Sequence, residues 1–274
     1  MKKLNLKEIQ QAELENLKFL DNLCKKENFT YYLAYGTLLG AVRHHGFIPW
    51  DDDTDIWMPR KDYEKFKKYC EKNADKLKPF KLCTRENTKN YPYGIARFAN
   101  QDYKYVSTRS DEVQFNLGVF TDIYPLDNFG NEDPIPMKKV SKYIGKKNIW
   151  YSRYCSFGAD NFIKSFLKKF LYLFLHVIHN HDYAEKIDNS IIKKIKNNTS
   201  DDDIYTGVLS WDNDFFFRYK KEEFQNKVLL KFEDVELFVP QGYKKILKIT
   251  YGDYLKLPPE SERHPYHGYK IYKK

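Results

Sequence analysis

The sequence predicts an α/β (α+β) protein in which a mixed β-sheet is flanked by helices. Apolar residues recur at three- and four-residue steps in several segments, which is typical of helices. Short runs rich in Tyr, Phe, Val and Ile lie between these segments, which is typical of strands. Of the 274 residues, 42% are hydrophobic and 17% aromatic, so the chain can bury a core large enough to offset the entropy lost on folding.

The first half is expected to alternate between helix and strand. Residues 4–28 form a predicted helix because Leu14, Leu17 and Leu20 fall on one face. The other predicted elements are, in order, a strand over 30–34, a helical turn over 38–42, a strand over 53–58, a helix over 62–78, and strands over 80–84, 93–99, 103–107 and 118–124. Pro59 and Pro125 are expected to end the strands before them, because proline cannot donate a hydrogen bond within a sheet.

The second half is predicted to be mainly helical and basic. This pattern runs from 136 to about 198, and short strands over 204–210 and 235–239 and a helix over 244–249 follow it. No Gly/Ser-rich linker separates the two halves. We therefore predict a catalytic core over 1–130 and a second region over 131–274 that packs on the core and helps to complete its site.

The composition restricts the class of protein and of partner. The formal net charge of +9 suits an anionic partner, although a Lys-rich solvated surface explains it equally well. Nucleic acid is not an expected partner, because the basic residues form no recognisable binding module. The four cysteines are far apart, which argues against a zinc site and favours reduced thiols in a cytoplasmic protein; they are Cys24, Cys70, Cys83 and Cys155. The first residues lack the apolar core of a secretory signal.

Residues 162–178 are aromatic and basic, and they raise the question of membrane contact. Their uninterrupted apolar part, 170–175, is far shorter than the roughly 20 residues that a spanning helix requires. Lysines before it would also suit a helix that lies at a membrane interface. We expect a buried core helix, and we keep peripheral contact with the inner face of the membrane through 162–178 as the alternative.

The most informative stretch runs from Tyr31 to Tyr63 and contains Asp53 and Asp55 on a predicted strand. Alternate side chains of a strand share a face, so these two carboxylates point the same way and repel one another unless a cation lies between them. Mg²⁺, or Mn²⁺, prefers such oxygen ligands. Asp122 is the predicted third ligand, because an Asp within a run of strand-forming residues is costly to bury unless it is paired or binds a metal.

Gly36 and Thr37 are candidates for binding phosphate. Glycine lets backbone amides approach an anion, and the helical turn that follows offers further free amides. Arg43 is expected nearby and suits bidentate phosphate binding, with a structural pairing to an Asp as the alternative. Nucleotidyltransferase-like enzymes hold a phosphate and its metal with a Gly-Thr pair placed before Asp-x-Asp. The pattern therefore indicates a nucleotidyltransferase-like sheet and phosphoryl-group chemistry.

Three other interpretations of the acidic residues compete with a metal site. A solvated loop is the commonest, and Asp201–Asp203 is expected to be one because it follows a polar stretch. A calcium loop fails, because Ile56 stands where that loop requires glycine. A buried salt-bridged cluster would involve Arg43 or Arg60. The metal site is favoured because apolar runs flank residues 51–55 on both sides.

These residues together resemble the LicD family of phosphotransferases. That family includes bacterial enzymes that transfer phosphocholine onto cell-surface glycans, and the fukutin-type ribitol-phosphate transferases are its relatives. The similarity covers 35–60, continues at 121–127 and returns at 251–259 and at the late His and Lys residues. It implies metal binding by Asp53, Asp55 and Asp122 and phosphate binding by Gly36-Thr37. At Arg97 the chain departs from the family pattern, which leaves the role of this residue open.

The resemblance implies Mg²⁺-dependent transfer of an alcohol phosphate from a CDP-alcohol to a sugar hydroxyl. Phosphocholine is the first choice for the group transferred, which makes CDP-choline the donor. The acceptor would be a cell-surface glycan or a teichoic acid precursor. Choline would need aromatic rings around its ammonium group. The candidate contacts to the alcohol or the acceptor are Trp50, Trp57, Tyr124, His264, His267 and Lys270. The alternatives are nucleotidyl transfer with release of pyrophosphate and non-catalytic binding of a polyanion. The sequence does not determine the alcohol, the acceptor sugar, the general base or the oligomeric state.

Overall fold

The structure, a computed structural model, describes residues 1–88, 91, 93–107, 117–130, 162–164, 166–167, 169–170, 200–208, 217–265 and 268–274. A seven-stranded mixed sheet forms its centre, with the main strand order β2-β3-β7-β5-β4. These strands are Tyr32–Leu33 (β2), Thr54–Pro59 (β3), Val119–Asn128 (β7), Ala96–Asn100 (β5) and Phe80–Cys83 (β4). Two short strands, Tyr205–Gly207 (β8) and Tyr219–Lys220 (β9), extend the sheet from the carboxyl end of β7.

The pairing within this sheet brings two predicted site residues together. β3 and β7 are parallel, and their register sets Asp55 directly beside Asp122. On the other side of β7, antiparallel β5 sets Arg97 opposite Asp122. The site therefore lies across three adjacent strands.

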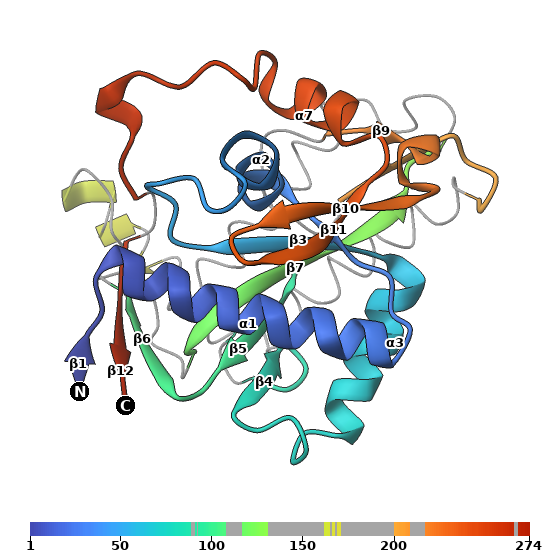
Figure 1. Cartoon of the computed structure of the whole chain (residues 1–274). Coiled ribbons are helices and arrows are strands. Elements are labelled where there is room, and N and C mark those ends of the chain that lie inside the picture. Colours follow the sequence, from blue (N-terminus) through green and yellow to red (C-terminus); the bar gives the residue numbers. More distant parts are fainter. Residues whose placement is uncertain are drawn as a thin grey trace.

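Helix α1 (Leu6–Lys26) crosses one face of the sheet (Figure 1). Asn5 begins the helix with a capping box: its side chain accepts from the Glu8 amide, and the Glu8 carboxylate accepts from the Asn5 amide. The apolar residues at three-residue steps, Leu14, Leu17 and Leu20, are buried in the main core, as their spacing predicts. Two further helices, α2 (Tyr35–His44) and α3 (Arg60–Lys72), precede and follow β3.

The C-terminal part packs against the elements around the site. The hairpin of β10 (Lys227–Phe232) and β11 (Val235–Pro240) leads to helix α7 (Tyr243–Tyr251). One 3-10 turn, η1 (Lys221–Phe224), precedes the hairpin, and another, η2 (Glu260–Glu262), follows α7. Strand β12 (Tyr269–Lys273) then pairs with both β1 (Lys2–Lys3) and β6 (Tyr103–Ser107). The two ends of the chain consequently lie side by side (Figure 1).

The α/β fold class is confirmed, and most elements before residue 130 lie within a few residues of their predicted positions. The prediction that Pro125 ends its strand is wrong, because β7 continues to Asn128. Strand β5 pairs with β7 only as far as Ile123, whereas β3 pairs with β7 past the proline, with Met58 beside Pro125. The helical turn predicted over 38–42 is part of the longer helix α2, whose first turn contains Gly36 and Thr37. Strands β1, β9, β10 and β12 were not predicted.

The predicted helical region, 136–198, lies almost entirely outside the described residues; positions 162–164, 166–167 and 169–170 are helical. From residue 200 onward the described chain is mostly strand and irregular structure, with α7 as its α-helix. The division into 1–130 and 131–274 stays a prediction. Within the described part of the chain, no helix combines the length and the apolar character needed to cross a membrane.

Candidate active site

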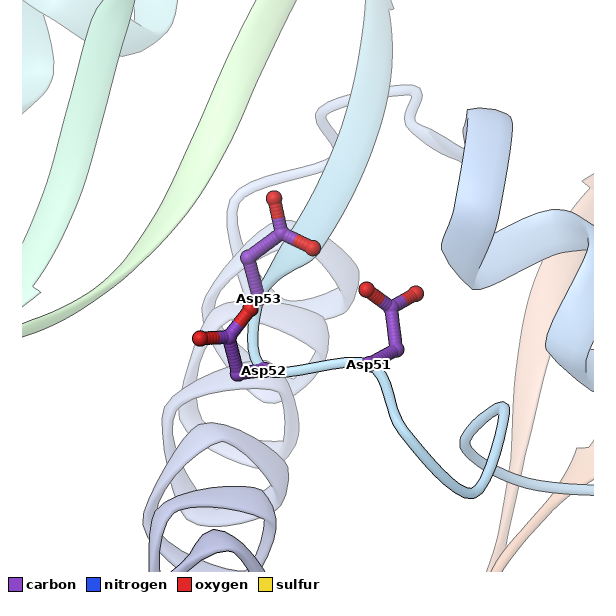
Figure 2. Close-up of side chains that lie close together, drawn as sticks. All are labelled: Asp51, Asp52 and Asp53. Atoms are coloured by element: carbon purple, nitrogen blue, oxygen red, sulfur yellow. The ribbon is translucent and has the colours of Figure 1, made fainter. Parts of the chain in front are cut away.

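Three carboxylates gather on the acidic loop, Asp51–Asp53, which enters β3. One oxygen from each of Asp51, Asp52 and Asp53 lies within 4.8 Å of the other two. Figure 2 shows the three side chains along one side of this loop. Asp52 is buried, whereas Asp51 and Asp53 are half-buried. Such a group of oxygen donors has the chemistry that Mg²⁺ and Mn²⁺ prefer.

Asp55, two residues further along, has a buried carboxylate oxygen that lacks a hydrogen-bond donor. Only 7% of the residue is exposed, and its Oδ1 has no partner within the described structure. Burial raises the pKa of Asp55 well above its usual value, and the charges of Asp53, Asp122 and Asp51 raise it further. A carboxylate in this position needs a proton or a cation, because an uncompensated buried charge is costly. The site therefore fits a divalent cation.

Asp122 is already partly compensated by Arg97. Arg97 Nε donates to Asp122 Oδ1 at 2.7 Å, and Nη2 donates to Oδ2 at 3.4 Å. The Arg97 guanidinium lies 3.8 Å from the Tyr93 ring centre and 4.1 Å from that of Phe120. Burial alone would lower the pKa of Arg97, but Asp122 and the two nearby tyrosines hold it well above its usual value. The pair fixes the Asp122 carboxylate, whose remaining lone pairs can still serve as ligands.

The first turn of α2 connects the acidic loop to β3. The Thr37 hydroxyl accepts a hydrogen bond from the Asp55 amide at 2.8 Å, so this side chain ties the helix to the strand. Gly36 lies against Asp51: a methyl group at Gly36 would be 2.8 Å from Asp51 Oδ2. Tyr35 adopts a left-handed φ of 39°, and its ring packs against Tyr124 with the centres 5.0 Å apart. The sequence pattern therefore reflects close packing as well as any anion binding.

A second polar cluster lies behind the site, on the face of the sheet that α1 covers. Glu13 accepts hydrogen bonds from the Thr54 hydroxyl at 2.8 Å and from the Phe120 amide at 3.2 Å. Asn16 donates to the Thr121 hydroxyl at 2.8 Å, and the Thr54 and Thr121 hydroxyls lie 2.9 Å apart. Burial raises the pKa of Glu13 well above its usual value. The alternation within β3 thus sends Thr54 to Glu13 and leaves its two flanking aspartates on the opposite face.

Arg43 and Arg60, the two arginines considered as partners of the acidic residues, donate hydrogen bonds to groups outside the acidic loop. Arg43 donates to the Tyr254 and Lys256 carbonyl oxygens at 3.1 and 3.4 Å, so it ties α2 to the segment after α7. Arg60 binds both carboxylate oxygens of Asp127 at 2.7 Å. The interpretation of a cluster salt-bridged to Arg60 is therefore not supported. The expectation of a solvated loop at Asp201–Asp203 holds for Asp201 and Asp202, which lie in an exposed turn, but not for Asp203, which is buried and accepts a hydrogen bond from the Gly130 amide at 2.8 Å.

The aromatic candidates fall into two groups. Trp57 is fully buried and packs against Tyr35 and Tyr219, so it belongs to the core and is not available to a ligand. Tyr124 is also buried, but its side chain hydrogen-bonds to Asp55 and lowers the pKa of that carboxyl. Trp50 is half-buried beside the acidic loop, and the Arg263 guanidinium lies 5.8 Å from its ring centre.

The three C-terminal candidates are not brought together. His264 is exposed between η2 and β12. Lys270 is exposed on β12 and, by strand alternation, lies on the opposite face from Tyr269, which contacts the acidic loop. His267 lies outside the described residues.

The prediction from sequence missed two neighbours of the site, Glu13 and Tyr251. Glu13 stands on the apolar stripe of α1, four residues after the buried Ile9 and four before the buried Leu17, and this spacing is a signal of burial that the prediction did not use. Tyr251 ends α7 and is 41% exposed. Burial of part of its ring raises the pKa of its phenol, and Asp55 and Asp51 raise it further, so the phenol lies near both carboxylates. The only hint of Tyr251 in the sequence is its place within the 251–259 similarity.

Comparison with known proteins supports the same chemistry. Residues 28–155 match the family model described as LicD/FKTN/FKRP, nucleotidyltransferase domain. The chain is 30% identical over 280 residues to the lipopolysaccharide cholinephosphotransferase LicD of Haemophilus influenzae, and the alignment covers 99% of both proteins. It is also 32% identical over 123 residues to an uncharacterized protein of Rickettsia typhi, an alignment that covers 45% of this chain and 37% of that protein.

Proposed function

Because the chain belongs to the LicD family and is a phosphotransferase of the LicD type, we propose that it transfers phosphocholine from CDP-choline to a sugar hydroxyl of a cell-surface glycan and releases CMP. The acceptor is a lipopolysaccharide or teichoic acid precursor. The observation that carries this proposal is the group of carboxylates at 51–53, followed by the buried Asp55, in a chain that aligns along 99% of its length with a cholinephosphotransferase.

Asp53, Asp55 and Asp122 would hold Mg²⁺, or Mn²⁺; Asp55 and Asp122 are neighbours across β3 and β7, and Asp51 and Asp52 add donors close to Asp53. The buried and unpartnered Asp55 Oδ1 is the observation that fits a cation here. A bound cation would supply charge neutralisation for the diphosphate of the donor and for the departing CMP. Arg97 would keep the Asp122 carboxylate in a fixed orientation.

The chain's own groups account for binding and proton transfer in this proposal. The amides in the first turn of α2, at Gly36 and Thr37, would face the donor's phosphates. Asp53 is half-buried, in contrast to Asp55 and Asp122, so it is the carboxylate to which we assign removal of the acceptor proton. Trp50 and Tyr251 would offer aromatic surface to the choline group.

The test is to incubate the full chain with CDP-choline, a lipopolysaccharide or teichoic acid precursor and Mg²⁺, and to measure CMP and choline-labelled glycan. We expect both products, and we expect both to disappear with EDTA and in Asp53→Asn. CTP in place of CDP-choline tests the alternative reaction. Release of pyrophosphate from CTP, without CMP from CDP-choline, would replace the proposal with nucleotidyl transfer.

A further inference from the structure

Tyr269, near the C-terminal end of the chain, holds the acidic loop by its backbone. Its phenol donates a hydrogen bond to the Asp52 carbonyl oxygen at 2.6 Å. The ring is fixed from the other side, since its centre lies 5.0 Å from that of Tyr105 and 6.1 Å from that of Phe120. Burial raises the pKa of Tyr269 well above its usual value, with Asp52 and Asp53 adding to the effect, so the phenol keeps the proton that it donates.

Gln10, on the first helix of the chain, holds the same loop from another direction. Its side-chain amide donates to the Asp51 carbonyl oxygen at 2.9 Å and to the Ile48 carbonyl oxygen at 3.3 Å. Ile48 also accepts from the Asp51 amide at 2.9 Å, which closes the turn before the loop. Gln10 therefore joins α1 to both ends of this turn.

Both contacts are made to backbone carbonyl oxygens of the loop and not to its carboxylate oxygens. Carboxylates whose oxygens lie within 4.8 Å of one another repel when they are ionised, and a bound cation between them would offset this repulsion, so a backbone that is held in place favours the arrangement a cation needs. Donors on carbonyls at two successive residues, Asp51 and Asp52, restrain the backbone at the point where the repulsion acts.

We propose that Gln10 and Tyr269 are positioning residues that hold the acidic loop in its cation-binding conformation, so that a helix and a strand from opposite ends of the chain prearrange one site. This inference rests on the proposed function for its biological meaning, but it concerns cation binding, which can be measured without substrate. Residues outside the ligand set that orient ligands commonly contribute 10- to 100-fold to metal affinity.

The experiment is a titration of the metal-free full chain with Mn²⁺ alone, in which calorimetry and electron paramagnetic resonance measure how much Mn²⁺ is bound. Tyr269→Phe removes one hydroxyl and keeps the ring, and Gln10→Leu removes one amide and keeps the size of the side chain. We expect each variant to bind Mn²⁺ about 10-fold more weakly and the double variant to bind it more weakly still. Melting temperatures in EDTA should stay close to that of the wild type.

Tyr32→Phe is the matched control. It also removes a phenol that donates to a carbonyl oxygen, that of Phe224 at 2.7 Å, but this bond lies away from the acidic loop. We expect its Mn²⁺ affinity to equal that of the wild type. Equal affinity in Tyr269→Phe and Gln10→Leu would overturn the proposal, and so would a wild type that binds no Mn²⁺, because the loop would then have no ion to hold.

The same proteins separate this inference from the proposed function. If the variants bind Mn²⁺ more weakly but the wild type releases no CMP from CDP-choline, the positioning role stands and the proposed function fails. If the wild type releases CMP while all variants bind Mn²⁺ as tightly as the wild type, the proposed function stands and the positioning role fails.

Discussion

Glu13 is a buried acid that faces the carboxylates of the site from behind the sheet. Only 2% of it is exposed, and it lies between Thr54 and the Phe120 amide. Burial is the largest cause of its raised pKa, and the charges of Asp53 and Asp122 raise the pKa further. Glu13 therefore favours its neutral form in the folded chain and loses that preference on unfolding.

This pKa difference predicts how stability depends on pH. A carboxyl group with a raised pKa in the folded state stabilises that state fully below its unfolded value, about 4.3, and the contribution is lost as the pH rises through the folded value. In EDTA, the free energy of unfolding of the wild type should fall above about pH 4.3. The side chain of Glu13→Gln cannot ionise, so the free energy of unfolding of this variant should fall less steeply with pH than that of the wild type, by up to about 1.4 kcal/mol for each pH unit.

Urea unfolding in EDTA between pH 5 and 8 measures this difference. Glu15→Gln is the control, because Glu15 is exposed on the same helix. The stability of Glu13→Gln relative to wild type should rise with pH, whereas that of Glu15→Gln should stay constant. Parallel pH profiles for all three proteins would show that Glu13 ionises normally.

Helix α2 is the element that links the separate parts of the site. Its first turn contacts the acidic loop at Gly36 and β3 at Thr37, and its last turn reaches the segment after α7 through Arg43. This ten-residue helix thus connects the acidic loop and the strand that directly follows it, β3, to a segment 211 residues beyond Arg43 in the chain. A change in this helix should alter the geometry of the carboxylates more than it alters the core.

Gly36→Ala tests this expectation. The new methyl group would lie 2.8 Å from Asp51 Oδ2, and a carboxylate at the end of its side chain can move away. Gly36 does not have a positive φ, and alanine favours helices over glycine by about 1 kcal/mol. We expect unchanged or slightly higher thermal stability in EDTA, together with weaker Mn²⁺ binding by calorimetry. A large loss of stability would mean that the backbone, and not Asp51, has to move.

The local elements of the site could be predicted from sequence, but its long-range contacts could not. Strand alternation predicted Asp53 and Asp55 on one face; β3 begins one residue after Asp53, and the charge of Asp53 is near enough to raise the pKa of Asp55. The burial cost of Asp122 pointed to a paired or ligating role, and Asp122 is paired with Arg97. The pairing of Asp122 with Arg97 depends on the order of strands, which local patterns do not encode. Gln10 and Tyr269 lie 41 and 217 residues from their partners in the acidic loop, so no spacing rule could connect them.

At the scale of the whole molecule, the fold joins its two ends into one small sheet next to the site. Strand β12 lies between β1 and β6. Ile271 of β12 is buried with Leu4 and Ile9 from the start of the chain, in a second core beneath the sheet edge. The position of Tyr269 on β12 therefore depends on this core.

Ile271→Ala is expected to weaken this region. Removing a buried Ile side chain costs about 2–5 kcal/mol, because apolar contact is lost and a cavity remains. Urea unfolding measures the total loss, and hydrogen exchange should show the largest increase at the amides of β1, β6 and β12. Lys270→Ala, at an exposed position of the same strand, should change neither the free energy of unfolding nor the hydrogen-exchange rates of these amides. A uniform increase in exchange across β3 and β7 would show that the small sheet does not open separately.

The location of Trp50 has a spectroscopic consequence. The indole directly precedes the acidic loop, is half-buried and lies beside the Arg263 guanidinium, whereas Trp57 is sealed within aromatic side chains of the core. A change of charge at Asp51 would alter the electric field at the Trp50 ring far more than at Trp57. The protein thus carries an intrinsic fluorophore next to the acidic loop, so the binding of an ion there should change the emission of Trp50 and can be followed by stopped-flow fluorescence without any label.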